Sequence, residues 1–173
     1  MEEIRFVTAP LKARFEEAEK KREVFKKEYA SLSEFEEDPV GQWLKIAKAR
    51  GETKESDQVL LTLLVELHKK VDRLTAIIKN EEKPLLALAH EAAIDKIGFE
   101  HIHFEKPVLH PNTLYYCRIE MPVFPQREMP LYFEAISPDI GKIVLMHHKD
   151  EQDWNAYVTA RERVMIREMK AQK

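Results

Sequence analysis

The hydrophobic positions of this 173-residue chain follow two different periods. Up to about residue 79, apolar residues recur every three or four positions, as they do on one face of a helix. From residue 84 to 150, apolar and polar residues alternate instead, as in half-buried strands. The period changes near "KNEEKPL" (79–85). We therefore predict a helical module over residues 1–82 and a separate strand-rich domain over residues 83–173.

Three helices are predicted in the first module. The first spans residues 10–32 with Thr8 as its N-cap, and a short one follows Pro39. The third has Ser56 as its N-cap and carries a heptad repeat with leucine at the d positions and β-branched residues at a positions, a pattern that favours two parallel strands. The apolar face must be covered by the first helix, by another subunit or by both, with a monomeric helical hairpin as the alternative to self-association. The heptad residues are Leu60, Leu64, Leu67, Val71, Leu74 and Ile78.

The second domain reads as short strands followed by a helix. Strands are predicted over residues 85–90, 98–104, 114–121, 131–136 and 142–148, which suggests a small antiparallel β-barrel. A closing helix follows, with Asp150 as its N-cap. The predicted fold class is α+β, with N-terminal helices, then the barrel, then the C-terminal helix.

Charge and composition narrow the possible partners. With 28 basic and 31 acidic residues the net charge is −3 at pH 7, which gives no electrostatic reason to expect a nucleic-acid partner. One cysteine, Cys117, excludes an internal disulfide and is expected to be buried and inert. We expect a cytoplasmic protein, because no signal peptide and no apolar run long enough to span a bilayer are found.

Catalytic motifs are missing from the sequence. No serine lies in a nucleophile elbow and no glycine loop has phosphate-binding spacing, so we expect no enzymatic activity and no cofactor. The histidines offer an alternative, since His101 and His103 share one strand face and could meet His90, His147 or His148 around zinc. We favour the solvated face of a sheet, and no metal, because no carboxylate or cysteine shows ligand spacing.

Two segments, "IDKIGFEHIHFEKPVLHPNTLYYCRIEMP" and "DEQDWNAYVTARERVMIREMK", resemble the PilZ domain family in pattern. The first is similar to the family's glycine turn, strand, loop and next strand, and the second to its terminal helix. The resemblance covers roughly residues 85–170 and implies a bacterial signalling protein in flagellar motility, type IV pili or biofilm control. The heptad helix ahead of this domain is similar to that of PilZ relatives that oligomerise through such helices.

Members of the family that bind cyclic di-GMP use an RxxxR arginine pair before the barrel and a DxSxxG motif on the turn. The second motif would fall on Ala93, Asp95 and Gly98, of which only Gly98 matches, and Asp95 places a negative charge where phosphate would approach. No arginine pair precedes the barrel, since Arg73 in the heptad helix is the only arginine between Asp72 and Ala93. The resemblance therefore implies a turn that kept its backbone role and lost the standard ligand chemistry.

These patterns predict a non-enzymatic adaptor. It would self-associate through the heptad residues and dock an unidentified protein, of the flagellar or pilus machinery, through Trp154, Tyr157 and Arg161. Two alternatives remain: a cyclic di-GMP receptor with an altered site, and a metal-dependent enzyme built on the histidines.

Overall fold

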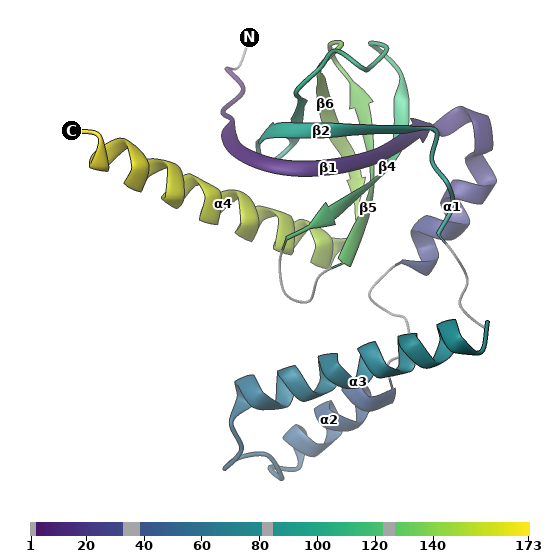
Figure 1. Ribbon diagram of the computed structural model, residues 1–173, viewed down its shortest axis with the longest axis vertical. Coiled ribbons are helices and arrows are strands. Elements are labelled where there is room, and N and C mark those ends of the chain that lie inside the picture. The colour runs from purple at the N-terminus through teal and green to yellow at the C-terminus, as the bar shows by residue number, and fades with distance from the viewer. Residues whose placement is uncertain (1–2, 33–38, 81–84, 123–126) are drawn as a thin grey trace. The chain divides into compact units, whose positions relative to one another are not determined.

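The computed structural model describes residues 3–32, 39–80, 85–122 and 127–173 (Figure 1). The chain forms two compact units. One combines Met1–Glu34 with Leu86–Lys173, and the other is Phe35–Leu85. The first unit is thus built from both ends of the chain, with the second inserted between them in sequence.

A closed antiparallel barrel dominates the first unit. The strands follow the order β1-β2-β3-β6-β5-β4 around the barrel, and together with the helices they confirm the α+β fold class. Their bounds are β1 (Val7–Glu17), β2 (His90–Ile97), β3 (His101–Phe104), β4 (Leu114–Met121), β5 (Arg127–Ala135) and β6 (Ile140–Met146).

Strand β1 overturns the helix predicted over residues 10–32. Along "VTAPLKARFEE" the buried residues alternate with exposed ones, which is the period of a strand. The misleading signal was the spacing of Leu11 and Phe15, because residues four apart share a face in a strand as well as in a helix. Helix begins only after the short 3₁₀ turn Ala18–Lys21, in α1 (Arg22–Ser31). The prediction that residues 1–82 are wholly helical was therefore wrong, since β1 is a barrel strand.

Because β1 was not predicted as a strand, its partner β2 was also misplaced in the prediction. Residues 85–89 are not strand, and β2 occupies the segment that we interpreted as a turn. It pairs antiparallel with β1, from Phe15 opposite His90 to Val7 opposite Ile97. Strand β4 matches the predicted residues 114–121, and β5 starts four residues before the predicted residue 131.

Helix α4 (His148–Ala171) closes the barrel on one side (Figure 1). Trp154 and Val158 are each 1% exposed and belong to the same core as the inward-facing barrel residues. The N-cap is His147, so the predicted cap at Asp150 was wrong. The Asp150 carboxylate instead forms an ion pair with Arg127 of β5, which fixes the start of the helix on the barrel.

Cys117 lies fully buried in β4, and burial raises the pKa of its thiol well above the ordinary range. Because the thiolate is the reactive form, we expect the native protein to resist Ellman's reagent at pH 8 for hours, while the urea-unfolded chain reacts within minutes. Absorbance at the thionitrobenzoate maximum measures both rates. A fast stoichiometric reaction of the folded protein would show that the β4 region opens readily.

The second unit contains α2 (Pro39–Ala49) and α3 (Gln58–Ile78), which pack against each other. Leu44 and Ala47 are buried on α2. Asp57, and not the predicted Ser56, caps α3, because its carboxylate accepts hydrogen bonds from the backbone N–H groups of Val59 and Leu60. Among the described residues, no helix is both long and apolar enough to cross a membrane.

Candidate functional site

The three positions of the ligand-loop motif lie along β2 and just beyond it. Ala93 is inside the strand, opposite Lys12 of β1. Asp95 lies at a register shift in the pairing of β2 with β3, and its carboxylate contacts Nδ1 of His103 at 2.5 Å. The other ring nitrogen, Nε2, lies 3.5 Å from the carboxylate of Asp139. Asp95 therefore contributes to an internal polar cluster.

Gly98 is required by the packing of the barrel. A Cβ atom at this position would come within 2.9 Å of the Arg5 carbonyl oxygen. The Gly98 carbonyl accepts a 3.0 Å hydrogen bond from the indole N–H of Trp154. The close approach of the Arg5 carbonyl explains a glycine here without a ligand.

The histidines do not form a metal centre in the described part of the chain. No group of three or more His, Cys, Asp or Glu residues there could hold a metal ion. His101 pairs across the sheet with Lys142, and partial burial lowers the pKa of its imidazole. The expected solvated sheet face is wrong for His103, whose side chain is only 20% exposed and lies between the carboxylates of Asp95 and Asp139.

The predicted docking residues separate into two kinds. The docking interpretation is wrong for Trp154, because its side chain is buried and packs within the core of the barrel. Tyr157 is partly buried against the same core, and Arg161 donates a 2.8 Å hydrogen bond from Nε to the Thr8 carbonyl. A docking role for Tyr157 and Arg161 stays a prediction.

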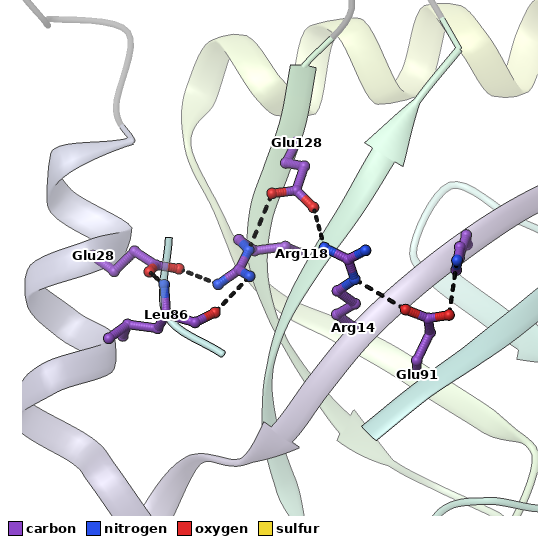
Figure 2. A network of polar contacts seen from close by, with 7 residues as sticks. Arg14, Glu28, Leu86, Glu91, Arg118 and Glu128 are labelled. Carbon is purple, nitrogen blue, oxygen red and sulfur yellow. Dashed lines mark hydrogen bonds and ion pairs between the residues drawn. The ribbon is translucent and has the colours of Figure 1, made fainter. Parts of the chain in front are cut away.

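Sequence reasoning missed a buried ion pair on the outer face of the barrel. Arg118 of β4 is only 2% exposed and donates to the Glu28 carboxylate of α1 (Figure 2). Glu28 also accepts from the Tyr116 hydroxyl at 2.7 Å and from the Leu86 N–H at 2.7 Å. Arg118 donates in turn to the Leu86 carbonyl. The side chains of Arg118 and Glu28 thus connect α1, β4 and the segment before β2.

The charges continue across the neighbouring strands in alternating sign. Glu128 lies between Arg118 and Arg14, at 3.4 and 3.6 Å, and Arg14 is paired with Glu91 (Figure 2). The hydrogen bond to Glu91 is the main cause that raises the pKa of Arg14. Because each guanidinium already has carboxylate partners, this pair of arginines does not form an open phosphate clamp.

Aromatic contacts complete the attachment of α1 to the sheet. Phe25 stacks on Tyr116 with ring centroids 4.9 Å apart. Tyr29 stacks on His147 at 3.9 Å and meets Tyr132 edge-on at 5.4 Å. Arg118 and Tyr116 looked like members of an alternating, half-solvated strand. Their burial follows from α1, whose position on this face no local pattern reveals.

Comparison with known proteins gives little independent support for a family. No family model matches the chain, and no curated protein matches it. A similar solved structure is that of a pathogenic protein from Xanthomonas campestris, described as a tetrameric PilZ domain self-assembled via a helical bundle. It is 14% identical, with a TM-score of 0.37, and the match covers 98% of this chain and 93% of the other. A similarity of this size does not assign the chain to the family.

Proposed function

We propose that the protein is a non-enzymatic adaptor that self-associates through α3 and presents its barrel unit to a protein partner. The observation that carries this proposal is the apolar surface of α3. No residue of the helix is buried, and all six heptad residues are 51–81% exposed. Three further large apolar side chains on the same helix are also exposed: Val59, Leu63 and Ile77.

A second copy of the chain is the occupant that the sequence of this surface favours. The exposed residues repeat with the 3.5-residue period of a coiled-coil seam, which is complementary to itself. An apolar surface of this kind is rarely left in water by a monomeric protein. Burial of each leucine contributes about 1.5–3 kcal/mol, so a few heptads are sufficient to drive association.

The test is sedimentation velocity at micromolar concentration. The wild-type chain is expected to sediment as a dimer or larger species, and Leu67→Asp, which places a charge at the centre of the seam, is expected to sediment as a monomer. Thr62→Asp is the matched control, because Thr62 is exposed and belongs to the f position, on the side of the helix away from the seam. A monomeric wild type would end the proposal.

The adaptor role includes loss of the standard cyclic di-GMP site. Ala93 offers no side-chain acceptor, the Asp95 carboxylate is held by His103, and the nearby arginines are paired with carboxylates. Each hydrogen bond to a charged group contributes about 1.5–3 kcal/mol. The combined loss of these contacts should therefore weaken cyclic di-GMP binding from micromolar to millimolar or worse.

We therefore expect no calorimetric heat of binding with cyclic di-GMP at about 100 µM. The pair of substitutions Ala93→Asp and Asp95→Ser is not expected to restore binding, because the arginine clamp is still missing. Saturable binding with a Kd of about 10 µM or tighter would instead favour a receptor with an altered site.

In the setting that the sequence resemblance implies, the protein partner of the adaptor would belong to flagellar, pilus or biofilm control in the cytoplasm.

A further inference from the structure

A small cavity lies between α1 and the outer face of the barrel, within the first unit. Its volume is about 240 Å³. Its walls are apolar and aromatic, and three charged side chains from the 3₁₀ turn and α1 complete the lining. The wall residues are Ala18, Tyr29, Leu114, Tyr132, Val144 and Leu145, and the charged residues are Glu19, Arg22 and Lys26.

A bulge in β6 shapes one wall of this cavity. Tyr132 of β5 pairs with Leu145, whereas the next residue, Phe133, pairs with Ile143, so Val144 is the extra residue. Neighbouring residues of a regular strand point to opposite faces, but here both Val144 and Leu145 line the same cavity. Both are also about half exposed, at 49% and 48%, so apolar surface extends from the cavity to the solvent.

One residue of the lining, Tyr132, carries a buried hydroxyl group. The Tyr132 side chain belongs to a residue only 8% exposed, and among the described residues its Oη has no hydrogen-bond partner. Such a hydroxyl has lost its hydrogen bonds to water without gaining others. Tyr29, on the adjoining wall, has its pKa raised to about 12, chiefly by burial, so its phenol stays protonated and can donate.

The charge around the cavity favours an anion. Arg22 and Lys26 lie one turn apart on α1, and among the described residues Arg22 has no ion-pair partner. Lys26 contacts Glu23 at 3.9 Å, with both side chains well exposed. Glu19 is the one carboxylate of the lining, which leaves a net charge of +1.

We propose that this cavity binds a bulky apolar side chain of a partner protein's peptide segment, with an adjacent acidic residue held by Arg22 and Lys26. The proposal rests on the adaptor function and specifies the chemistry of its partner. A cavity of about 150 Å³ already accepts benzene, so the volume here suits one aromatic or leucine side chain. It is smaller than the pockets of drug-sized ligands, about 300–1,000 Å³. The apolar surface that continues onto Val144 and Leu145 suits a chain that extends beyond the cavity.

The test uses isotope-labelled full-length protein and short peptide probes. The probe is N-acetyl-Glu-Phe-Glu-amide, and we expect amide shifts confined to α1, β5 and β6 with a Kd of about 1 mM or tighter. N-acetyl-Glu-Ala-Glu-amide removes the apolar group, and N-acetyl-Lys-Phe-Lys-amide reverses the charge. Both are expected to bind at least about tenfold more weakly, since each loses about 1.4 kcal/mol or more.

Single substitutions test the role of the charged side chains beside the cavity. Arg22→Glu is expected to weaken the acidic probe about fivefold, while Lys27→Glu, an exposed charge change on α1 outside the lining, leaves the affinity within about twofold. Tyr132→Phe removes only a buried hydroxyl that lacks a partner, so the protein is expected to fold normally and, because the apolar side chain in the cavity offers that hydroxyl no acceptor, to bind the acidic probe within about twofold.

Three outcomes would overturn the proposal. They are no shifts with the acidic probe up to about 10 mM, equal binding of the alanine or lysine probes, or tighter binding of free 3-phenylpropionate than of the peptide. The last result would identify a small-molecule carboxylate site instead. Sedimentation of the same samples keeps the two proposals apart, because a dimer that binds no probe disproves only the peptide site.

Discussion

Replacing Arg118 with methionine is expected to lower the free energy of unfolding by about 3–5 kcal/mol. The substitution keeps an apolar stem of similar length but leaves the Glu28 carboxylate buried beside Tyr116 without its cation. It also removes the donor to the Leu86 carbonyl. The loss of the cation from a buried ion pair is costly because the remaining carboxylate has given up its water and keeps only the neutral donors Tyr116 and Leu86.

Arg14 provides a matched control, because it lies directly opposite Arg118 in the pairing of β1 with β4 and shares Glu128 with it. Its side chain is 47% exposed and its ion pairs are screened by water, so Arg14→Met is expected to destabilise the protein far less than Arg118→Met. The double substitution Arg118→Met with Glu28→Gln removes both charges and keeps an amide for Tyr116 and Leu86. It is expected to recover about 2 kcal/mol of the loss.

Urea unfolding at one fixed protein concentration measures these differences, since association makes stability depend on concentration. Fluorescence in a Trp43→Phe background reports on the barrel alone, because Trp154 is then the only tryptophan. An Arg118→Met variant no less stable than Arg14→Met would show that α1 is held by its aromatic contacts and that the ion pair contributes little.

The sequence predicted those parts of the fold whose pattern is local. Strand β4 and helix α3 were found because each repeats one period over a long run. Strand β1 was missed because its spacing of four fits either period, and β2 was then misplaced because its partner was unknown. Local pattern cannot show that a strand from the N-terminus closes a barrel with strands from the second half of the chain.

The candidate site was predictable only in part, for a similar reason. The mismatches at Ala93 and Asp95 are visible in the sequence, but the contact of Asp95 with His103 needs the register of β2 against β3. Arg118 alternates with apolar residues and gives no signal of burial until α1 covers it. Trp154 was assigned to docking because an aromatic on an amphipathic helix can face either a core or a partner.

Trp154→Ala is expected to destabilise the barrel unit by about 3–5 kcal/mol, which is the usual cost of deleting a large aromatic side chain from a core. The indole is 1% exposed, packs within the main core and donates to the Gly98 carbonyl. Its loss would leave a cavity and an acceptor without its donor. The expected fall in Tm, at about 2–4 °C per kcal/mol for a chain of this size, is about 6–20 °C.

Two further variants, one on α4 and one just after β2, identify the cause of this loss. Met169→Ala removes a side chain that is 62% exposed on α4, so it is expected to change stability by less than about 0.5 kcal/mol. Gly98→Ala would press a methyl group against the Arg5 carbonyl at 2.9 Å and shift the acceptor of the indole. If Trp154 closes the barrel through Gly98, the combination of Trp154→Ala and Gly98→Ala should cost less than the sum of the two single losses. Strict additivity, measured by calorimetry of all four proteins, would show that the two residues act independently and that α4 is held by packing alone.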